Sequence, residues 1–366
     1  MKQTILIGPM NKKDVGSIPI LNRAFAIGLR EEYDFIPFNV NRKYGKSSVS
    51  NFNIINLGYF VLHYLTLIFK LIKDRPDVFH YAITSNWNFE KSVFFLKTAK
   101  FFGVKKVIGH LHGGSFDIFI NKLEGSRKKR AIKWMNSLDA IIVASNYWKS
   151  FLISKEVDTI VEVVNNPIDT NYVKEIKNKK DVKRQNRFLF VGALGERKGF
   201  YDIIEAATDI NEDFVLDAVG SEDRQNDMVK INDLIEKNRL SSKINIIVSE
   251  KMKIQEKVDF FTKNAIFLFP SHNENFPLVI IEAACAGMAI ISTKVGAIPE
   301  FFTHMKNIYF ITPGDVNEMR EAIDFITKNT DERIRLGNEA RKVYETKLSE
   351  GIVMNQLDSV YKTILN

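Results

Sequence analysis

Short hydrophobic runs alternate with longer amphipathic segments along the whole chain. The runs are rich in Val, Ile, Leu and Phe and end at glycine or polar turns, which is typical of buried strands. In the first half these expected strands are 4–8, 34–40, 78–83, 105–111, 140–144 and 159–164. Between them, helical spacing predicts helices at 18–30, 54–73, 88–102, 123–137 and 147–154. Repeated strand–helix units of this size indicate a parallel, doubly wound sheet.

The second half repeats this alternation after a charged, polar run at 174–187, which we interpret as the approach to a second domain. The expected strands are 188–191, 214–219, 244–248, 265–269, 290–291 and 308–311. The expected helices are 201–208, 227–237, 254–263, 278–286, 316–327, 331–346 and 352–365. A chain of 366 residues is too long for one ordinary core, so two domains are expected.

The stretch 271–287 carries the strongest chemical signal. It follows the strand 265–269 and Pro270, which ends that strand. It contains a short polar loop before Pro277. Proline suits a first helical turn, and Gly287 would end the helix 278–286. In open α/β sheets such a loop lies at the carboxyl end of a strand, where ligands bind. The backbone N–H groups that begin this helix suit a phosphate, and they belong to Phe276, Leu278 and Val279.

Two carboxylates bracket this loop. Glu274 precedes the expected helix, and Glu282 lies within it among Val, Ile, Ala and Cys residues. A carboxylate in such surroundings should not be buried without a partner. A ribose diol would be a suitable partner. In the alternative interpretation, Glu282 pairs with a core Arg or Lys and Glu274 is a solvated loop residue.

A basic glycine-containing segment follows the first strand of the second half. Gly192 allows the backbone to approach a ligand, and Arg197 and Lys198 provide a forked and a point charge for a diphosphate. Positive charges at a helix start oppose the helix dipole, which favours a functional role over a solvated helix terminus. Gly220 ends the next strand in a similar position.

The first half offers two weaker candidate loops. His112 follows a strand and precedes two glycines, which favours function, although a lone histidine is usually structural. Gly16 and Ser17 precede the first expected helix, where a helix start could contact phosphate or acceptor. A plain connecting loop is the alternative for this segment, and His80 is interpreted as an ordinary core or rim residue.

These residues resemble a known enzyme family. Glu274 and Glu282, with seven residues between them, resemble the E-x7-E motif of retaining glycosyltransferases of family 4, the glycosyl transferases group 1 family. The segments 284–291 and 295–300 are similar to the family's A-x-G-x-P-V-I and G-G-x-x-E segments, with Ala289 for the usual proline. Segment 192–199 is similar to G-R-L-x-x-x-K-G, so Lys198 carries over more firmly than Arg197.

The resemblance implies the GT-B fold, an α/β architecture of two doubly wound Rossmann-like domains facing across a cleft. It assigns 1–166 to an acceptor-binding domain and 167–348 to a nucleotide-sugar-binding domain, with a final helix at 349–366 crossing back to the first. It also implies that the catalytic residues are His112 and Glu274. The implied donor-binding residues are Gly16, Gly192, Arg197, Lys198, Gly220, Asn275, Phe276, Pro277, Leu278 and Glu282.

The implied function is retaining, metal-independent transfer of a hexose-type sugar from a nucleotide-diphosphate sugar. A UDP-sugar is favoured over a GDP-sugar, although no motif distinguishes the two bases. The expected acceptor is a glycan, such as a lipid-linked intermediate of bacterial surface polysaccharide synthesis. Two alternatives remain open at this point: a GT-B nucleotide-sugar epimerase, which turns over donor without acceptor, and a non-catalytic partner subunit of another transferase.

The composition of the chain predicts its cellular location and its need for cofactors. The single cysteine excludes a disulfide within the chain, and no signal-peptide pattern is seen, so a cytoplasmic location is expected. No cofactor is expected, and no acidic or His/Cys pattern indicates a metal. The run at 54–69 is short and interrupted for a membrane span, so we expect a largely buried helix there.

The net charge of +8 is compatible with nucleic acid, an anionic membrane or anionic substrates, but no nucleic-acid motif is present. The densest basic cluster is followed by Lys133 and Trp134, a combination that suits the headgroup region of an anionic leaflet. A solvated helix face is an equally good interpretation. The cluster consists of Arg127, Lys128, Lys129 and Arg130.

Overall fold

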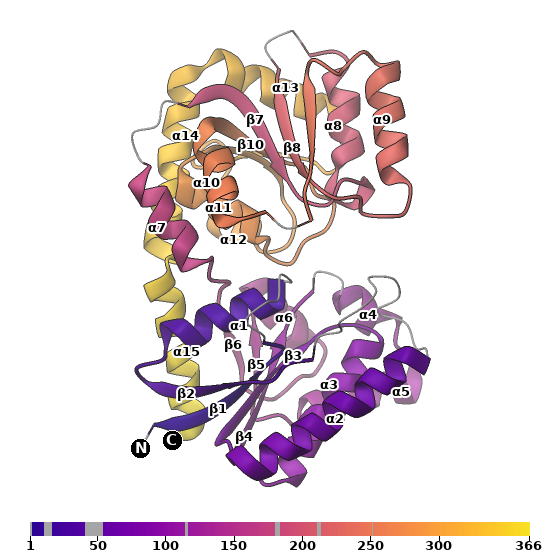
Figure 1. The fold of residues 1–366 in the computed structure, drawn as a ribbon, viewed down its shortest axis with the longest axis vertical. Coiled ribbons are helices and arrows are strands. Elements are labelled where there is room, and N and C mark those ends of the chain that lie inside the picture. Colours follow the sequence, from indigo (N-terminus) through magenta and orange to yellow (C-terminus); the bar gives the residue numbers. More distant parts are fainter. Residues whose placement is uncertain are drawn as a thin grey trace. The chain divides into compact units, whose positions relative to one another are not determined.

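The computed structural model describes residues 2–10, 17–40, 54–113, 116–179, 184–210, 214–250 and 252–366. The chain divides into two compact units: unit 1 contains Met1–Pro167 and Glu350–Asn366, and unit 2 contains Ile168–Ser349. Each unit has a six-stranded parallel sheet with helices against it (Figure 1). The expected α/β class with two doubly wound domains is confirmed.

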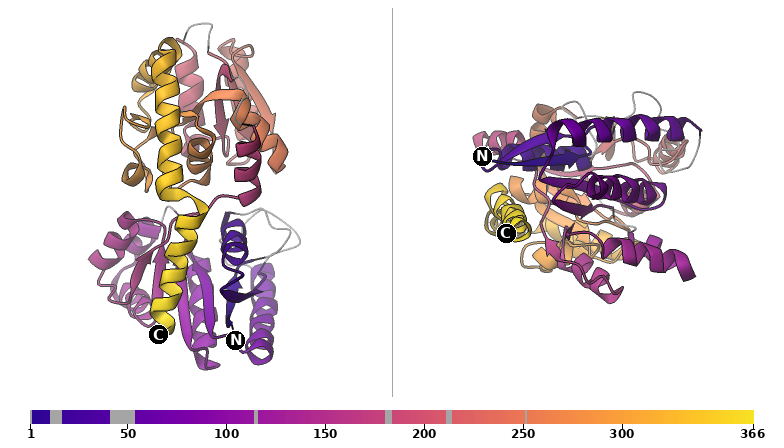
Figure 2. Two further views of the ribbon diagram at one scale, coloured as in Figure 1. Left: turned by 90° about the vertical axis from the view of Figure 1, so that its left-hand side faces the viewer. Right: turned by 90° about the horizontal axis from the view of Figure 1, so that it is seen from below.

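Unit 1 has the strand order β2-β1-β3-β4-β5-β6. Its strands are β1 (Gln3–Gly8), β2 (Tyr33–Pro37), β3 (Val78–Ile83), β4 (Lys106–Leu111), β5 (Ala140–Val143) and β6 (Val161–Val163). Its helices are α1 (Ser17–Gly28), α2 (Ile54–Asp74), α3 (Trp87–Phe101), α4 (Phe116–Lys122), α5 (Gly125–Met135), α6 (Asn146–Ser154) and α15 (Glu350–Leu365). The chain reverses its direction across the sheet between β1 and β3, so α1 and α15 share one face while α2 and α3 cover the other (Figure 2).

Unit 2 has the strand order β12-β11-β10-β7-β8-β9. Its strands are β7 (Gln185–Val191), β8 (Leu216–Gly220), β9 (Ile244–Val248), β10 (Asn264–Phe269), β11 (Ala289–Thr293) and β12 (Tyr309–Ile311). The helices are α7 (Thr170–Asn178), α8 (Phe200–Ala207), α9 (Asp227–Lys237), α10 (Ile254–Lys263), α11 (Leu278–Ala286), α12 (Ile298–Phe301), α13 (Val316–Lys328) and α14 (Thr330–Val343). The strand order reverses between β7 and β10, which makes this the topological switch point.

The structure differs from the predicted elements at three places. The connection expected at 174–187 begins within a helix, α7, because its apolar residues Tyr172 and Ile176 are four apart and buried. Asp169 caps this helix by accepting a hydrogen bond from the N–H of Asn171 at 2.8 Å. The helix expected at 123–137 is α5, which begins at Gly125 with a φ of 50°, and an additional short helix, α4, precedes it where none was predicted. The expected helix 331–346 changes to a π-helix at Tyr344–Leu348.

The prediction that α2 is largely buried is wrong. One of its faces packs into the core of unit 1 through Leu67 and Leu71, but several large apolar side chains on its other face are exposed. The physical reason is its position in the outer helical layer, where α3 covers only one side of it (Figure 1). Among the described residues, no helix combines the length and hydrophobicity required to cross a membrane.

Candidate functional site

The loops that follow β7 and β10 meet at the topological switch point of unit 2. Gly199 has a φ of 71°, and a Cβ atom added to it would lie 2.1 Å from the carbonyl oxygen of Pro270. The N–H of His272 donates a hydrogen bond of 3.0 Å to the carbonyl oxygen of Arg197. These backbone contacts hold the two loops together, so side chains from both converge there.

The convergence brings Lys198 and Glu274 into an ion pair. Glu274 also accepts a hydrogen bond from Ser271 Oγ at 2.8 Å, and Lys198 Nζ lies 5.0 Å from the ring centroid of Phe269. Burial lowers the pKa of Lys198 from its ordinary value, while the charge of Glu274 opposes this shift. Two residues that are 76 positions apart therefore form one buried charged unit at the carboxyl end of the parallel strands.

Arg197 lies at the exposed side of this unit. Its Nη2 is 3.3 Å from Asp223 Oδ1, and its Nη1 is 3.9 Å from Glu274 Oε1. Arg197 and Lys198 both belong to a short 3-10 helix, Glu196–Lys198, which presents the two cations side by side. The arrangement provides two adjacent positive charges, of which one is almost buried and the other is nearly half exposed.

Glu282 lies in α11 and is only 3% exposed. Its Oε1 is 2.5 Å from Nζ of Lys257, a residue of α10 that the sequence did not single out. For this oxygen the alternative interpretation from the sequence, that Glu282 pairs with a lysine or arginine of the core, is therefore correct. Oε2 is buried and has no hydrogen-bond partner in the described part of the chain. One oxygen of Glu282 is thus held in place, and the other keeps its capacity to accept a hydrogen bond.

The turn between Glu274 and α11 is fixed by the segment 295–300. The N–H of Ala297 donates a hydrogen bond of 2.8 Å to the carbonyl oxygen of Asn275, and Phe276 stacks on Phe301 with ring centroids 4.9 Å apart. A Cβ atom on Gly296 would lie 2.1 Å from the Asn275 carbonyl oxygen, so only glycine fits there. Pro277 is the N-cap residue of α11, and the first N–H groups of the helix lack intrahelical acceptors.

Two of the predicted glycines have different surroundings. A Cβ atom on Gly220 would lie 1.8 Å from the carbonyl oxygen of Gly192, so Gly220 is needed for the close approach of two strand ends. A Cβ atom on Gly192 would meet the ring of Phe190 at 3.3 Å and that of Phe269 at 3.8 Å, so it would not meet the backbone. The predicted Gly16 lies outside the described residues.

His112 lies in unit 1 at the end of a row of buried aromatic side chains. Its ring stacks on that of His110, with centroids 4.1 Å apart, and His110 Nδ1 lies 3.0 Å from His80 Nε2. His80 Nδ1 lies 2.6 Å from the hydroxyl of Tyr361 in α15. Burial lowers the pKa of both His80 and His112 to about 3 and that of His110 well below its ordinary value. The three imidazoles are therefore neutral near pH 7.

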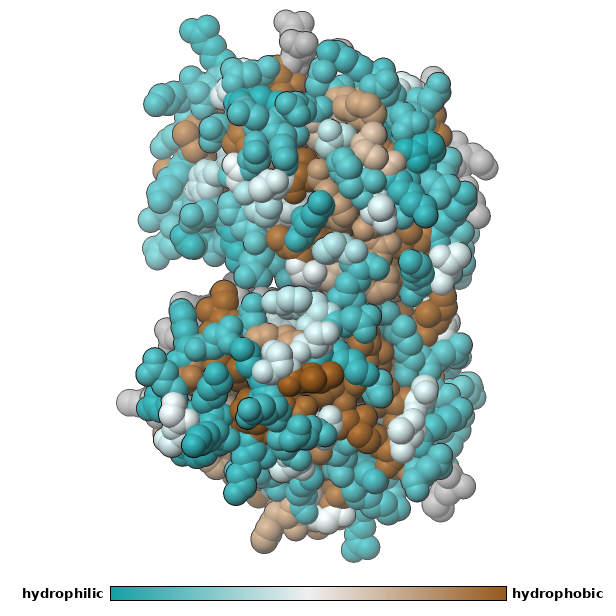
Figure 3. All heavy atoms as spheres, turned by 180° about the vertical axis from the view of Figure 1, so that it is seen from behind, coloured by the Kyte–Doolittle hydropathy of each residue, from teal (hydrophilic) through white to brown (hydrophobic). Residues whose placement is uncertain are grey.

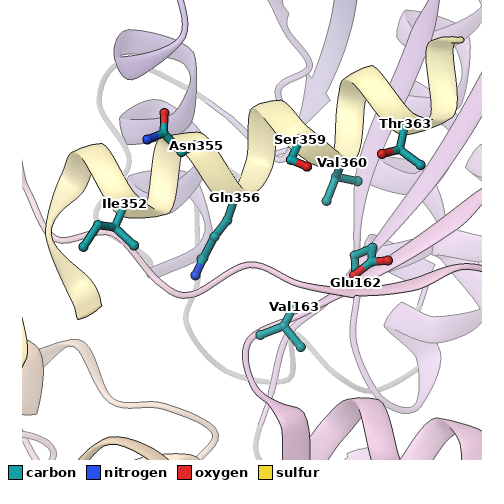
Figure 4. A pocket seen from close by; sticks show the side chains of 8 residues that line it. All are labelled: Glu162, Val163, Ile352, Asn355, Gln356, Ser359, Val360 and Thr363. Atoms are coloured by element: carbon teal, nitrogen blue, oxygen red, sulfur yellow. The ribbon is translucent and has the colours of Figure 1, made fainter. Parts of the chain in front are cut away.

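The other described parts of the chain show weaker candidates for a functional site. No group of three or more His, Cys, Asp or Glu side chains is suitably placed to hold a metal ion within the described ranges. A groove of about 500 Å³ in unit 1 lies between β6 and α15 (Figure 4). Gln356 on its wall already exchanges hydrogen bonds with Asn165, at 2.9 Å in each direction. None of the predicted site residues lines this groove.

The part of the chain that contains the unit 2 site matches a known family model. Residues 173–343 match the Glycosyl transferases group 1 family model. The matched segment contains Lys198, Lys257, Glu274 and Glu282.

Curated relatives match over part of their length. The chain is 25% identical to the capsular polysaccharide biosynthesis glycosyltransferase CapM of Staphylococcus aureus, over 48% of this chain and 46% of that protein. It is 27% identical to the 2-deoxystreptamine N-acetyl-D-glucosaminyltransferase of Niallia circulans, over 75% of this chain and 64% of that protein. The chain thus spans about half to two thirds of the length of these relatives.

A solved structure extends the similarity of fold to the whole chain. Anabaena HepE in complex with UDP aligns with a TM-score of 0.75 and 15% identity, covering 99% of this chain and 100% of that one. At this level of identity the likeness shows the fold alone, which is GT-B.

Proposed function

We propose that the protein is a glycosyltransferase that uses a nucleotide-diphosphate sugar as donor. The observation that carries this proposal is the Lys198–Glu274 pair, formed at the switch point of unit 2 within the segment that matches the group 1 model. Ligands of open α/β sheets bind at this place, and a charged pair there is suited to an anionic donor. The names of the matched relatives support the same class of activity.

Each residue of the unit 2 site has a proposed role in holding the donor. Lys198 and Arg197, with the first N–H groups of α11, hold the diphosphate, because fixed positive charge and a helix start favour anions. Glu282 accepts hydrogen bonds from the ribose through Oε2, whose position is maintained by Lys257 on Oε1. Glu274 and the turn at Asn275 and Phe276 orient the hydroxyls of the sugar.

The proposed reaction is a substitution at the anomeric carbon with retention. The bond between this carbon and the diphosphate oxygen breaks, and a bond to the acceptor hydroxyl oxygen forms on the same face. The hydroxyl proton passes to the departing phosphate oxygen. Lys198 and Arg197 stabilise the charge that develops on the diphosphate, and no metal ion is required in this scheme. His112, neutral in unit 1, is proposed as a hydrogen-bonding residue at the reacting sugar.

The proposed donor is a hexose-type UDP-sugar, and the proposed acceptor is a lipid-linked glycan of bacterial surface polysaccharide synthesis. Complexes of the similarly folded HepE with UDP and with UDP-glucose support the choice of base. The names of a Staphylococcus aureus relative and of an Escherichia coli O-antigen mannosyltransferase support the polysaccharide context. Unit 1 is proposed to bind the acceptor, and the cytoplasm is the proposed location.

The test is thermal unfolding of the purified protein with UDP, GDP, CMP, ADP and their common sugar conjugates, with and without EDTA. A ligand that binds only the native state raises the melting temperature. We expect an EDTA-insensitive increase with UDP and its conjugates. Donor turnover is then measured with and without acceptor glycans, because turnover that needs no acceptor would indicate an epimerase instead.

A matched pair of lysine variants makes this test specific. Lys198→Met should abolish the nucleotide-dependent increase, whereas Lys328→Met, on an exposed i,i+4 pair of α13, should retain it. Glu282→Gln should reduce the affinity for UDP-sugar and for UDP alike, because the ribose is common to both. If Lys198→Met still binds every nucleotide as the wild type does, the proposed diphosphate site is wrong.

A further inference from the structure

The outer face of α2 carries a continuous row of exposed apolar side chains, which we call the α2 stripe. Its members are between 42% and 62% exposed, although they are all large hydrophobic residues. At helical spacing they fall within an arc of about 140°, on the side of α2 away from the core residues Leu67 and Leu71. The stripe consists of Leu57, Val61, Leu62, Leu65, Phe69 and Ile72.

The neighbouring helix α3 adds a further exposed aromatic side chain beside α2. The ring of Phe94, which is 54% exposed, lies 5.7 Å from that of Phe60. At the carboxyl end of α2, Ile72 and Phe102 line a groove of about 410 Å³. Monomeric soluble proteins rarely expose contiguous apolar surface of this kind unless it binds something.

The charges around the α2 stripe are mainly positive, because the two carboxylates near it, Asp74 and Asp77, are each paired with a lysine. Residues 54–73 contain no Asp or Glu, and Asp74 lies 3.8 Å from Lys70 in an ion pair. Nζ of Lys73 lies 5.7 Å from the ring centroid of Phe69, so its methylene chain runs along the stripe toward solvent. Arg75 lines the groove, is exposed, and has no ion pair or hydrogen bond to the described residues.

We propose that the α2 stripe docks on the surface of an anionic lipid bilayer, with α2 lying in the plane of the interface. Apolar side chains inserting among acyl chains, with Lys and Arg at the level of the headgroups, are the pattern of interfacial helices. This deepens the proposed function by naming the surface that would bring the enzyme to a lipid-linked acceptor. The binding itself requires no substrate, so it is tested separately from the activity.

A second copy of the chain is the less favoured occupant. In a two-fold dimer the same patch is used by both copies. The basic residues Lys73 and Arg75 would then meet a surface whose helix has no carboxylate free to pair with them. An anionic bilayer complements both the apolar and the basic part of the surface.

The aromatic residue beside the basic cluster of α5 is buried, contrary to expectation. Trp134, the aromatic residue beside that cluster, is only 5% exposed and packs edge-on against Phe89 at 5.0 Å. It therefore cannot reach a bilayer, and the prediction of an aromatic anchor there is wrong. The face of the molecule opposite to Figure 1 is mainly hydrophilic with scattered apolar patches (Figure 3). The α2 stripe differs from such patches in its continuity along one helix.

The experiment is sedimentation of the full chain with vesicles of equal parts phosphatidylglycerol and phosphatidylcholine, and with vesicles of phosphatidylcholine alone. We expect binding to the anionic vesicles that weakens with salt. Phe69→Asp and Ile72→Asp should each lower the partition constant by about tenfold or more. The control is Ile334→Asp, because Ile334 is a helical isoleucine of unit 2 with nearly the same exposure, 56% against 59%.

A charge variant separates the two parts of the interaction. Lys73→Glu should weaken binding to the anionic vesicles only, by several-fold, and the exposed Lys328→Glu should not. Thermal unfolding verifies that each variant is folded. No binding of the wild type to anionic vesicles, or equal effects of Ile72→Asp and Ile334→Asp, would overturn the proposal. So would a wild-type dimer, seen by light scattering, that Phe69→Asp converts to monomer while vesicle binding is unchanged.

Discussion

Lys257 Nζ lies 2.5 Å from Glu282 Oε1, while Oε2 of the same carboxylate is buried without a partner in the described part of the chain. The pair joins α10 to α11 beneath the proposed donor site. Tyr172 belongs to the same arrangement, since its hydroxyl donates a hydrogen bond of 3.0 Å to the carbonyl oxygen of Glu282 and its ring lies 5.7 Å from Lys257 Nζ. Lys257 thus gives the carboxylate of Glu282 a cationic partner within an apolar helix.

Replacing Lys257 should destabilise unit 2. Lys257→Met leaves Glu282 without its cation, and breaking a buried ion pair in this way lowers the free energy of unfolding by about 3 kcal/mol. For a domain of this size each kcal/mol corresponds to a decrease of roughly 2–4 °C in melting temperature. Calorimetry of Lys257→Met, of Glu282→Gln and of the variant that combines them measures the effect.

The double variant Lys257→Met/Glu282→Gln is the control for this prediction. Because no uncompensated charge remains, its free energy of unfolding should exceed that of Lys257→Met alone. Equal destabilisation of the single and the double variant would mean that the pairing is not what Lys257 contributes. The lost contact between the ammonium group of Lys257 and the ring of Tyr172 would then be the explanation.

Gly296→Ala should disturb the donor site more than an ordinary glycine substitution does. The added Cβ would lie 2.1 Å from the carbonyl oxygen of Asn275 and 2.5 Å from that of Glu274, so the turn before α11 must move. We expect loss of most of the nucleotide-dependent increase in melting temperature.

Gly314→Ala is the matched control for this variant. Gly314 has a similar positive φ, 78° against 56°, but an added Cβ would meet only His272 Cε1 at 3.9 Å. Both variants therefore carry the backbone strain of alanine at positive φ, roughly 1 kcal/mol. Only Gly296→Ala should affect ligand binding. Equal binding by the two variants would show that the turn tolerates the displacement.

Unit 1 should lose stability in acid through its buried histidines. Folding lowers the pKa of His80 and His112 to about 3, while in the unfolded chain it is near 6.5. The unfolded state therefore binds more protons between these values. The stability that neutral histidines provide is complete above pH 6.5 and decreases as the pH falls toward 3, by up to about 1.4 kcal/mol per pH unit for each histidine.

Melting temperatures between pH 4 and pH 8 test this prediction. His112→Gln should show a shallower decrease below pH 6.5 than the wild type, because one titrating group is absent. At pH 8, where all three rings are neutral in both states, any remaining difference reports packing alone. An unchanged acid slope in His112→Gln would contradict the neutral burial of this ring.

The local features of the fold were predictable from the chain. Strand and helix periodicity have short range, so the parallel α/β architecture and the strand–loop–helix unit around Glu274 follow from neighbouring residues. The helix α11 begins at Leu278 and ends at Ala286, as Pro277 and Gly287 predict. Where local cues were ambiguous the predictions were wrong or incomplete: the segment of α7 was expected to be a connection, and the short helix α4 was not predicted.

The sequence by itself therefore determined the fold class, the order of the elements and the loop residues at the switch point. The tertiary structure decided the partners and the exposure of these residues. Lys257 is 25 positions from Glu282, and Tyr361 is 281 positions from His80, so no local pattern connects them. The apolar run at 54–73 is compatible equally with a buried and an exposed helix, because hydrophobicity measures the preference of a side chain and not the presence of a neighbour. Only the packing of α2 against α3 shows which face of α2 is covered by other residues and which face is exposed.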